Sequence, residues 1–205
     1  MKTIFLDRDG VINRNRDNDY VKSWDEFEFL PNSKKAIQLL TDAGYQLIVV
    51  TNQACINKGI ISSQTLDAIH RQMIREIEGA GGHIHAIYYC PHREDEGCDC
   101  RKPKPGMLTQ AAHEHAIDLS HAFLIGDSMR DIAAGRQAGC RPLLVLTGHA
   151  SRVYQEEVER SEIPPQSPLF KGGKGGFVGV ARKEVDSQPE KVFADLYAAA
   201  LWILK

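Results

Sequence analysis

The chain begins with a short apolar segment that ends abruptly in acidic residues. Residues 3–6 read Thr-Ile-Phe-Leu, and Asp7 and Asp9 follow almost at once. An apolar run of this length is typical of a strand buried in a sheet. Carboxylates at the end of such a strand are costly to hold unless a cation or a chemical task requires them. A simple turn, for which the pair Asp9-Gly10 is well suited, is the alternative at this point.

The same pattern recurs further along the chain. Two more apolar runs, residues 45–50 and 122–125, also stop at polar groups. A segment with helical periodicity lies between the first two runs, and a strand, a helix and a strand in this length form a right-handed βαβ unit with parallel strands. The sequence therefore predicts an α/β fold with a parallel central sheet. Other predicted elements are strands at 84–89 and 141–146 and a helix at 106–117.

Parallel strands bring their carboxyl ends to one edge of the sheet, where open α/β folds bind ligands. Asp7, Asp9 and Asp127 would meet at this edge and would repel one another without a divalent cation. Mg²⁺ prefers such oxygen ligands, so we expect a magnesium site here. Thr51 and Asn52 would add a hydroxyl and an amide suited to a phosphate. The alternative is that these two residues only cap the next segment.

A cluster of soft metal ligands follows the third predicted strand. Cys90 and His92 are separated by one residue, as are Cys98 and Cys100, with a short acidic loop between the pairs. Four such donors can close tetrahedrally on Zn²⁺, and a site with four protein ligands is structural. We therefore predict a zinc loop over residues 90–100, which would also account for the odd number of cysteines. A redox pair or scattered buried thiols are the alternatives.

Basic residues follow the zinc loop directly. Prolines hold Arg101 and Lys102 in extended backbone, so the two cations would form an anion site if they point at the carboxylates, or otherwise a solvated basic turn. The polar loop after the first strand leaves from the same edge of the sheet. Its residues Asn18, Asp19 and Tyr20 are candidates for substrate contacts, although a solvated loop is the simpler interpretation.

Composition limits the remaining possibilities. The 205 residues suit one domain, 1–205, and a formal net charge of −2 argues against nucleic acid as a partner. The absence of a long apolar run and of a signal-peptide pattern predicts a cytoplasmic protein without a membrane span, and a monomer is expected. Residues 164–180 are of low complexity and are expected to form an insertion, followed by a closing strand and helix within 190–205.

Together these motifs resemble a known family. Asp7-x-Asp9-Gly10, Thr51-Asn52-Gln53, Lys102 and Gly126-Asp127-x3-Asp131 are similar to the four ordered motifs of the haloacid dehalogenase superfamily of phosphohydrolases. The Cys-x-His and Cys-x-Cys pairs that lead into Arg-Lys-Pro resemble its zinc-containing branch. The likeness covers roughly residues 1–149 and implies a Rossmannoid three-layer sandwich without a large cap domain.

The resemblance also implies a mechanism. Asp7 would be the nucleophile that forms an aspartyl phosphate, and Asp9 would be the general acid and base. Thr51 and Lys102 would hold the transferring phosphoryl oxygens. Mg²⁺ would be bound by Asp7, by the backbone carbonyl of Asp9 and by Asp127, and the Zn²⁺ would be structural.

The implied substrate is a small phosphorylated sugar. The resemblance favours removal of the C7 phosphate from D-glycero-D-manno-heptose 1,7-bisphosphate, in the biosynthesis of activated heptose for lipopolysaccharide-type carbohydrates. Histidinol phosphate is the alternative substrate, and a phosphate-binding module without turnover or a phosphotransferase of the same fold are further alternatives. Arg101 would recognise a second phosphate. The other expected substrate contacts are Asn18, Asp19, Tyr20, Asn52 and Gln53.

Overall fold

The computed structural model describes residues 2–16, 19–149 and 188–205. Its centre is a six-stranded parallel sheet with the strand order β3-β2-β1-β4-β5-β6, as the sequence predicted for the sheet type. The opening strand is central, so its carboxyl end lies between those of β2 and β4. The strands are β1 (Thr3–Leu6), β2 (Gln46–Asn52), β3 (Ala86–Cys90), β4 (Phe123–Gly126), β5 (Arg141–Val145) and β6 (Lys191–Phe193).

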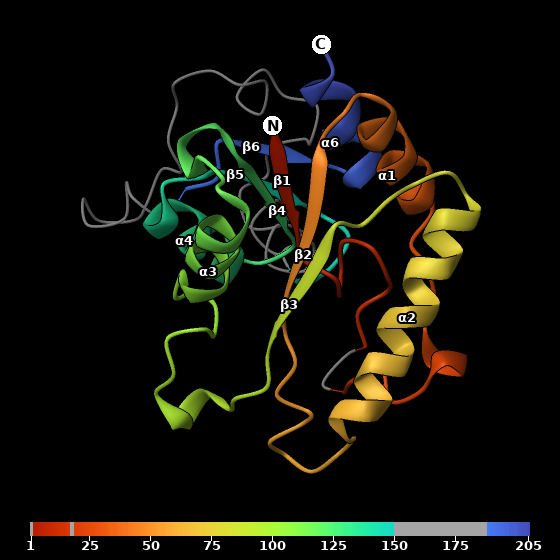
Figure 1. The fold of residues 1–205 in the computed structure, drawn as a ribbon, viewed down its shortest axis with the longest axis vertical. Coiled ribbons are helices and arrows are strands. Elements are labelled where there is room, and N and C mark those ends of the chain that lie inside the picture. The colour runs from red at the N-terminus through yellow and green to blue at the C-terminus, as the bar shows by residue number, and fades with distance from the viewer. Residues whose placement is uncertain (1, 17–18, 150–187) are drawn as a thin grey trace, which may run out of the picture.

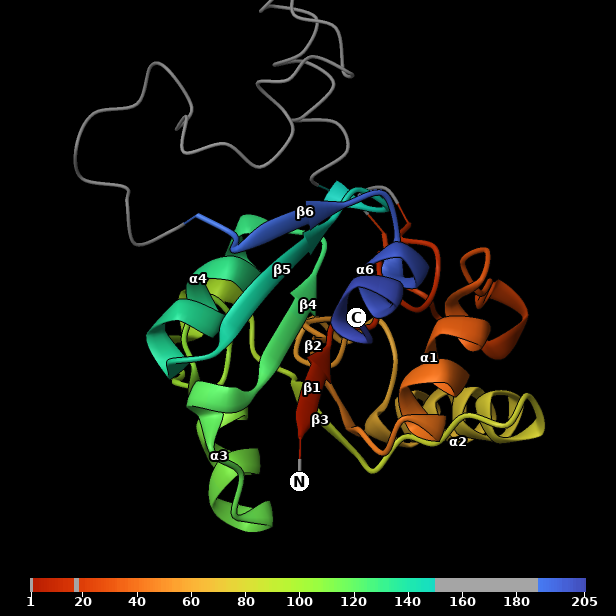
Figure 2. The same ribbon diagram turned by 90° about the horizontal axis from the view of Figure 1, so that it is seen from above.

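Helices cover both faces of the sheet and complete a three-layer sandwich. Figure 2 shows α1, α2 and α6 on one side of the strands and α3 and α4 on the other, and Figure 1 shows the same layers from a second direction. The helices are α1 (Ser33–Asp42), α2 (Ser63–Gly79), α3 (Gly106–His115), α4 (Met129–Ala138) and α6 (Leu196–Ile203). Short 3₁₀ helices are η1 (Trp24–Glu26), η2 (Glu94–Glu96) and η3 (Leu119–His121).

Strand β1 supplies side chains to two hydrophobic cores because successive residues point to opposite faces of the sheet. Ile4 and Leu6 belong to the core that includes α1, α2 and α6, whereas Phe5 belongs to the core that includes α3 and α4. All three side chains are fully buried, and each contributes roughly 1.5–3 kcal/mol by leaving water. The packing of both faces therefore fixes the position at which Asp7 emerges.

Several element boundaries differ from the predictions. Strand β3 begins at Ala86 rather than at residue 84 and continues to Cys90, which pairs with Asn52. Asn52 ends β2, which therefore extends two residues beyond the predicted end at residue 50. Helix α3 ends at His115, because Ala116 adopts a left-handed conformation with φ of 50°. Periodicity alone does not locate such ends, since they depend on strand pairing and on single backbone angles.

The predicted closing elements are present as β6 and α6. Strand β6 pairs with β5, and the side chain of Asp195 accepts a hydrogen bond from the backbone N–H of Ala198 as the N-cap of α6. The predicted insertion at 164–180 lies outside the described residues.

The carboxyl edge of the sheet carries no large cap in the described ranges, where the segment between β1 and β2 contains η1 and α1 and the segment between β2 and β3 contains α2. The described helices are also all too short or too polar to cross a lipid bilayer.

Candidate active site

The carboxyl ends of β1 and β4 bring three acidic side chains together. Oxygen atoms of Asp7, Asp127 and Asp131 lie within 4.8 Å of one another, which confirms the predicted meeting of Asp7 and Asp127. Asp7 follows β1 directly, and Asp127 follows β4, whose Ile125 pairs with the last residue of β1. Asp131 comes from the first turn of α4, where its carboxylate also accepts hydrogen bonds from the backbone and the hydroxyl of Ser128.

Three glycines allow the backbone to pass close to these carboxylates. A Cβ atom at Gly10 would lie 2.3 Å from Asp127 Oδ2, and one at Gly148 would lie 1.9 Å from the same atom. At Gly126 it would lie 2.1 Å from Asp131 Cβ. Gly10 also has φ of +83°, a conformation that disfavours other residues. Any side chain at these positions would displace a carboxylate.

Lys102 supplies the positive charge next to the acidic cluster. Its Nζ lies 3.0 Å from Asp7 Oδ1 and 2.6 Å from Asp131 Oδ1, and it donates to the backbone carbonyl of Val50 at 2.8 Å. Burial would lower the pKa of Lys102, but Asp131 and Asp7 outweigh it and raise this pKa, so the amine stays charged. Asn52 fixes the adjacent backbone, accepting from the N–H of Lys102 at 3.1 Å and donating to its carbonyl at 3.0 Å.

The acidic cluster has the properties of a cation site. Burial, followed by repulsion from Asp131 and Asp9, raises the pKa of Asp7 to about 7, although Lys102 opposes the change. Burial, Asp131 and Asp7 likewise raise the pKa of Asp127 well above its usual value. Three carboxylates therefore face one lysine in a confined space, and hard oxygen donors of this kind fit Mg²⁺. A divalent cation would relieve the repulsion that raises these pKa values.

Asp9 faces a different set of partners from Asp7. Its carboxylate accepts hydrogen bonds from Arg8, from Asn13 Nδ2 at 2.9 Å and from Gln53 Nε2 at 2.8 Å. Burial would raise the pKa of Asp9, but the Arg8 guanidinium and these hydrogen bonds lower it. Gln53 also donates to Thr51 Oγ1 at 2.9 Å, which leaves the hydroxyl proton of Thr51 available for another acceptor. Gln53 is fully buried, and its predicted contact with substrate stays a prediction.

Of the predicted substrate contacts on the loop after β1, the structure describes Asp19, which is exposed, and Tyr20, which is half-buried. Asp19 forms an ion pair with Lys22 at 2.7 Å, and the ring of Tyr20 lies 5.3 Å from the Nζ of Lys58. Asn18 lies outside the described residues. Their contacts with substrate stay predictions.

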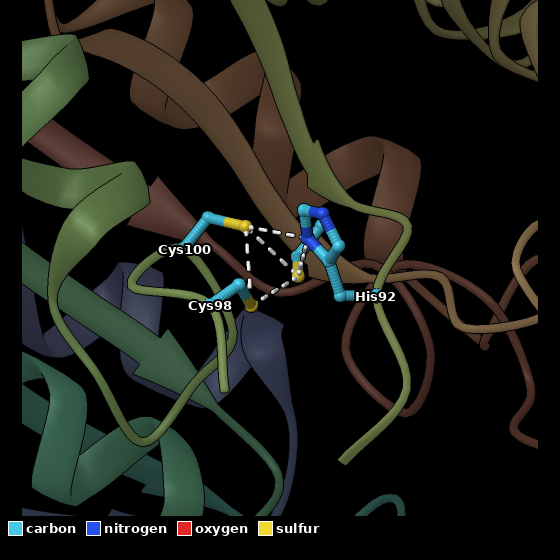
Figure 3. Close-up of side chains that lie close together, drawn as sticks. His92, Cys98 and Cys100 are labelled. Atoms are coloured by element: carbon cyan, nitrogen blue, oxygen red, sulfur yellow. Dashed lines mark hydrogen bonds between the residues drawn. The ribbon is translucent and has the colours of Figure 1, made fainter. Parts of the chain in front are cut away.

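The predicted zinc ligands converge on one point. Figure 3 shows His92, Cys98 and Cys100 pointing toward one another, and one ligand atom from each of these residues and Cys90 lies within 4.8 Å of the others. The Sγ–Sγ distances of 3.0–3.6 Å are too long for disulfides, and all five cysteines are free. Zn–S bonds of about 2.3 Å place tetrahedral sulfurs about 3.8 Å apart, so the cluster fits one Zn²⁺ after small outward shifts. The guanidinium of Arg101 donates to the His92 carbonyl at 3.2 Å.

The zinc loop is also tied to the segments on either side of it. The side chain of Asn57 donates to the carboxylate of Glu96 at 3.0 and 3.1 Å, which connects the loop to the segment after β2. Arg130, at the start of α4, forms an ion pair with Glu94 at 3.1 Å. The loop that leads into Lys102 is therefore attached to both neighbouring segments.

Sequence reasoning missed several residues of this site. Arg8 is fully buried and contacts both Asp9 and His70, a buried histidine of α2. After β5, Thr147 donates to the carbonyl of Gly10 at 2.5 Å, and the backbone N–H of His149 donates to Asp127 at 2.7 Å. The apolar run at 141–146, which is followed by the polar, glycine-containing segment 147–149, was the signal that could have indicated these contacts.

Comparisons with known proteins agree with this arrangement. A family model described as HAD-hydrolase-like matches residues 99–168. The chain is 46% identical, over 76% of its length and 87% of the relative, to a D-glycero-beta-D-manno-heptose-1,7-bisphosphate 7-phosphatase of Bordetella bronchiseptica. It is 45% identical, over 73% of its length and 83% of the relative, to a protein of the same name from Pseudomonas aeruginosa.

Solved structures give the same result. The crystal structure of D,D-heptose 1,7-bisphosphate phosphatase from B. bronchiseptica, complexed with magnesium and phosphate, aligns with a TM-score of 0.81 and 39% identity over 100% of this chain and 98% of that one. The parallel sheet with an acidic edge at β1 and β4 thus defines a haloacid dehalogenase-like hydrolase, a phosphoric monoester hydrolase. Within that class, the chain belongs to the D-glycero-beta-D-manno-heptose-1,7-bisphosphate 7-phosphatase family.

The first prediction concerns the cysteine cluster. Replacing one ligand in Cys98→Ser should lower the zinc content and reduce the Tm by about 5 °C or more, because ligand loss removes binding energy that is also folding energy. Elemental analysis and calorimetry measure both effects. The control is Asp99→Asn, a change at an exposed residue of the same loop, which should retain zinc. Full zinc content in Cys98→Ser would contradict a four-ligand site.

The second prediction concerns the acidic cluster and pH. The folded, metal-free protein holds Asp7 with a pKa near 7, above its value in the unfolded chain, so stability should fall as the pH rises from about 4 to about 7. Mg²⁺ competes with these protons and should raise the Tm more at about pH 8 than at about pH 6. Asp127→Asn should reduce this rise, whereas Asp118→Asn, at an exposed residue of the 3₁₀ turn before β4, should not. Equal effects of Mg²⁺ at both pH values would count against the cation site.

Proposed function

We propose that this chain hydrolyses the C7 phosphate ester of D-glycero-D-manno-heptose 1,7-bisphosphate, within the biosynthesis of activated heptose. The names of the relatives at 45–46% identity support this substrate, and the magnesium and phosphate in the related B. bronchiseptica structure support the ion and the ligand class. The single observation that carries the proposal is the placement of Asp7. Its carboxylate lies at a sheet edge between a buried lysine and two further acids.

Asp7 is the proposed nucleophile. Its Oδ1 accepts a hydrogen bond from the backbone N–H of Arg8 at 2.7 Å and lies 3.0 Å from Lys102 Nζ, so the carboxylate is fixed in one orientation. Attack on phosphorus forms an aspartyl phosphate and releases the sugar oxygen, and water then hydrolyses the acyl phosphate. Lys102 is close enough to both the nucleophile and the incoming phosphoryl group to offset their negative charge.

The residues that would hold Mg²⁺ are Asp7, Asp127 and the backbone carbonyl of Asp9. The ion supplies charge compensation that lets an anionic nucleophile approach an anionic phosphate. Asp131 already pairs with Lys102 and caps α4, and we propose that it orients the lysine rather than the substrate.

Asp9 is the proposed general acid and base. Its carboxyl group protonates the leaving sugar oxygen in the first step and accepts a proton from the attacking water in the second. Thr51 directs its hydroxyl proton to a phosphoryl oxygen, because Gln53 already donates to its oxygen. Gln53 also donates to Asp9. Its side-chain amide therefore orients both Thr51, which contacts a phosphoryl oxygen, and Asp9, which protonates the leaving oxygen.

Arg101 is the proposed ligand of the second phosphate of the substrate. It stands beside Lys102 and is anchored to the zinc loop through the His92 carbonyl, which leaves other guanidinium donors for an anion. The zinc cluster therefore has a structural function, since it orders the segment that carries both cations.

The test is a phosphate-release assay with the heptose bisphosphate and with histidinol phosphate. The heptose bisphosphate should be the better substrate, with release dependent on Mg²⁺. Asp7→Asn should lower kcat by about 10³-fold or more, because an amide cannot form the aspartyl phosphate.

Asp7→Asn should stay folded, because Lys102 keeps Asp131 as a partner. Asp118→Asn is the matched control and should retain full activity. Turnover by a folded Asp7→Asn variant would remove Asp7 from the mechanism, and preference for histidinol phosphate would overturn the substrate assignment.

A further inference from the structure

A buried cation that the proposed chemistry does not use lies beside the general acid. The Arg8 side chain is completely buried, and its Nη2 lies 2.9 Å from both carboxylate oxygens of Asp9, with Nε at 3.3 Å from Oδ1. Burying a guanidinium is costly unless it is paired and its donors are satisfied. Asp9 accepts from Nε and Nη2 of the guanidinium, so the remaining nitrogen, Nη1, needs another acceptor.

His70 of α2 is that partner. Arg8 Nη1 lies 3.1 Å from His70 Nε2, and the histidine side chain is almost fully buried. A guanidinium has only donors, so Nε2 must accept, and the ring must be neutral with its proton on Nδ1. Burial and the neighbouring Arg8 lower the pKa of His70 to about 3, which agrees with a neutral ring.

The planar guanidinium of Arg8 couples its contact with His70 to its contact with Asp9. Because the group is planar and rigid, holding Nη1 at His70 also fixes the direction in which Nε and Nη2 point. Asn13 and Gln53 each donate one further hydrogen bond to Asp9. The contact with His70 differs from these because it reaches Asp9 only through Arg8, from a helix 62 residues further along the chain.

We propose that His70 is a positioning residue that acts through Arg8 to hold the carboxyl group of Asp9 in line with the leaving oxygen. This inference rests on the proposed function, in which Asp9 protonates that oxygen. General acids need a heavy-atom distance within hydrogen-bond reach, so a carboxyl group that is free to rotate transfers its proton less efficiently.

The proposal predicts an effect that depends on the leaving group. A sugar alkoxide leaves poorly without a proton, whereas 4-nitrophenolate leaves readily as an anion. Loss of positioning should therefore lower kcat/KM for the heptose bisphosphate and leave kcat/KM for 4-nitrophenyl phosphate nearly unchanged. A general loss of structure would lower both values.

The experiment compares two substitutions at one position. His70→Phe keeps a ring but removes the acceptor, and it should lower kcat/KM for the heptose bisphosphate about tenfold or more, with KM little changed. The value for 4-nitrophenyl phosphate should stay within about threefold of wild type. His70→Gln, which restores an acceptor, should recover most of the lost rate. Ile69→Val, a packing change at the adjacent buried residue of α2, is the control and should retain full activity with a slightly lower Tm.

Several results would overturn the proposal. These are equal losses for both substrates in His70→Phe, no rescue by His70→Gln, or ¹⁵N spectra of the wild-type protein that show a proton on Nε2 of His70. The spectra need no variant, so the proposal can be tested even if His70→Phe fails to fold.

Asp9→Asn separates this proposal from the function on which it rests. If Asp9→Asn shows the leaving-group dependence and His70→Phe does not, the positioning role is wrong and the function stands. If Asp9→Asn affects neither substrate, the role of Asp9 and the inference about His70 are both wrong.

Discussion

The close approach of the three carboxylates at the sheet edge depends on the ion pairs that the ammonium group of Lys102 forms with two of them. This group reaches Asp7 from one side and Asp131 from the other, and its third partner is a carbonyl of β2. Without it, the three buried carboxylates would face one another with no ion pair to a basic side chain among the described residues. The position of this one amine is set by the cysteine and histidine cluster before it and by Asn52 beside it. The position of the acidic cluster's counter-charge therefore depends on the zinc loop.

Much of this arrangement could be predicted from the sequence because it follows from sheet topology. Apolar runs that end at Asp7, Thr51 and Asp127 indicated the strands, and the handedness of βαβ crossovers placed their ends at one edge. The spacing of the cysteines and His92 was equally informative, since few other functions need four soft donors in eleven residues. Patterns that repeat along the chain or have a fixed spacing are visible without coordinates.

The features that could not be predicted depend on side-chain directions across large sequence separations. Nothing in the sequence pairs Arg8 with His70, or the backbone of His149 with Asp127. The use of Asn52 was also hidden, because an amide after a strand suits a substrate as well as the backbone of Lys102. Strand ends such as that of β3 depend on pairing with β2, which a single strand does not encode. In each case the missing information is three-dimensional contact rather than residue type.

The attachment of Lys102 to the zinc loop has a consequence for how this enzyme would fail. The sheet is held by two apolar cores, whereas the loop is held by a few exposed polar contacts and by the cysteine and histidine cluster that could hold a metal ion. Segments of the second kind open at a lower free energy than the core does. Heat or a chelating agent would thus inactivate the enzyme while its strands remain paired. Activity would then be lost before the spectroscopic signal of the folded sheet changes.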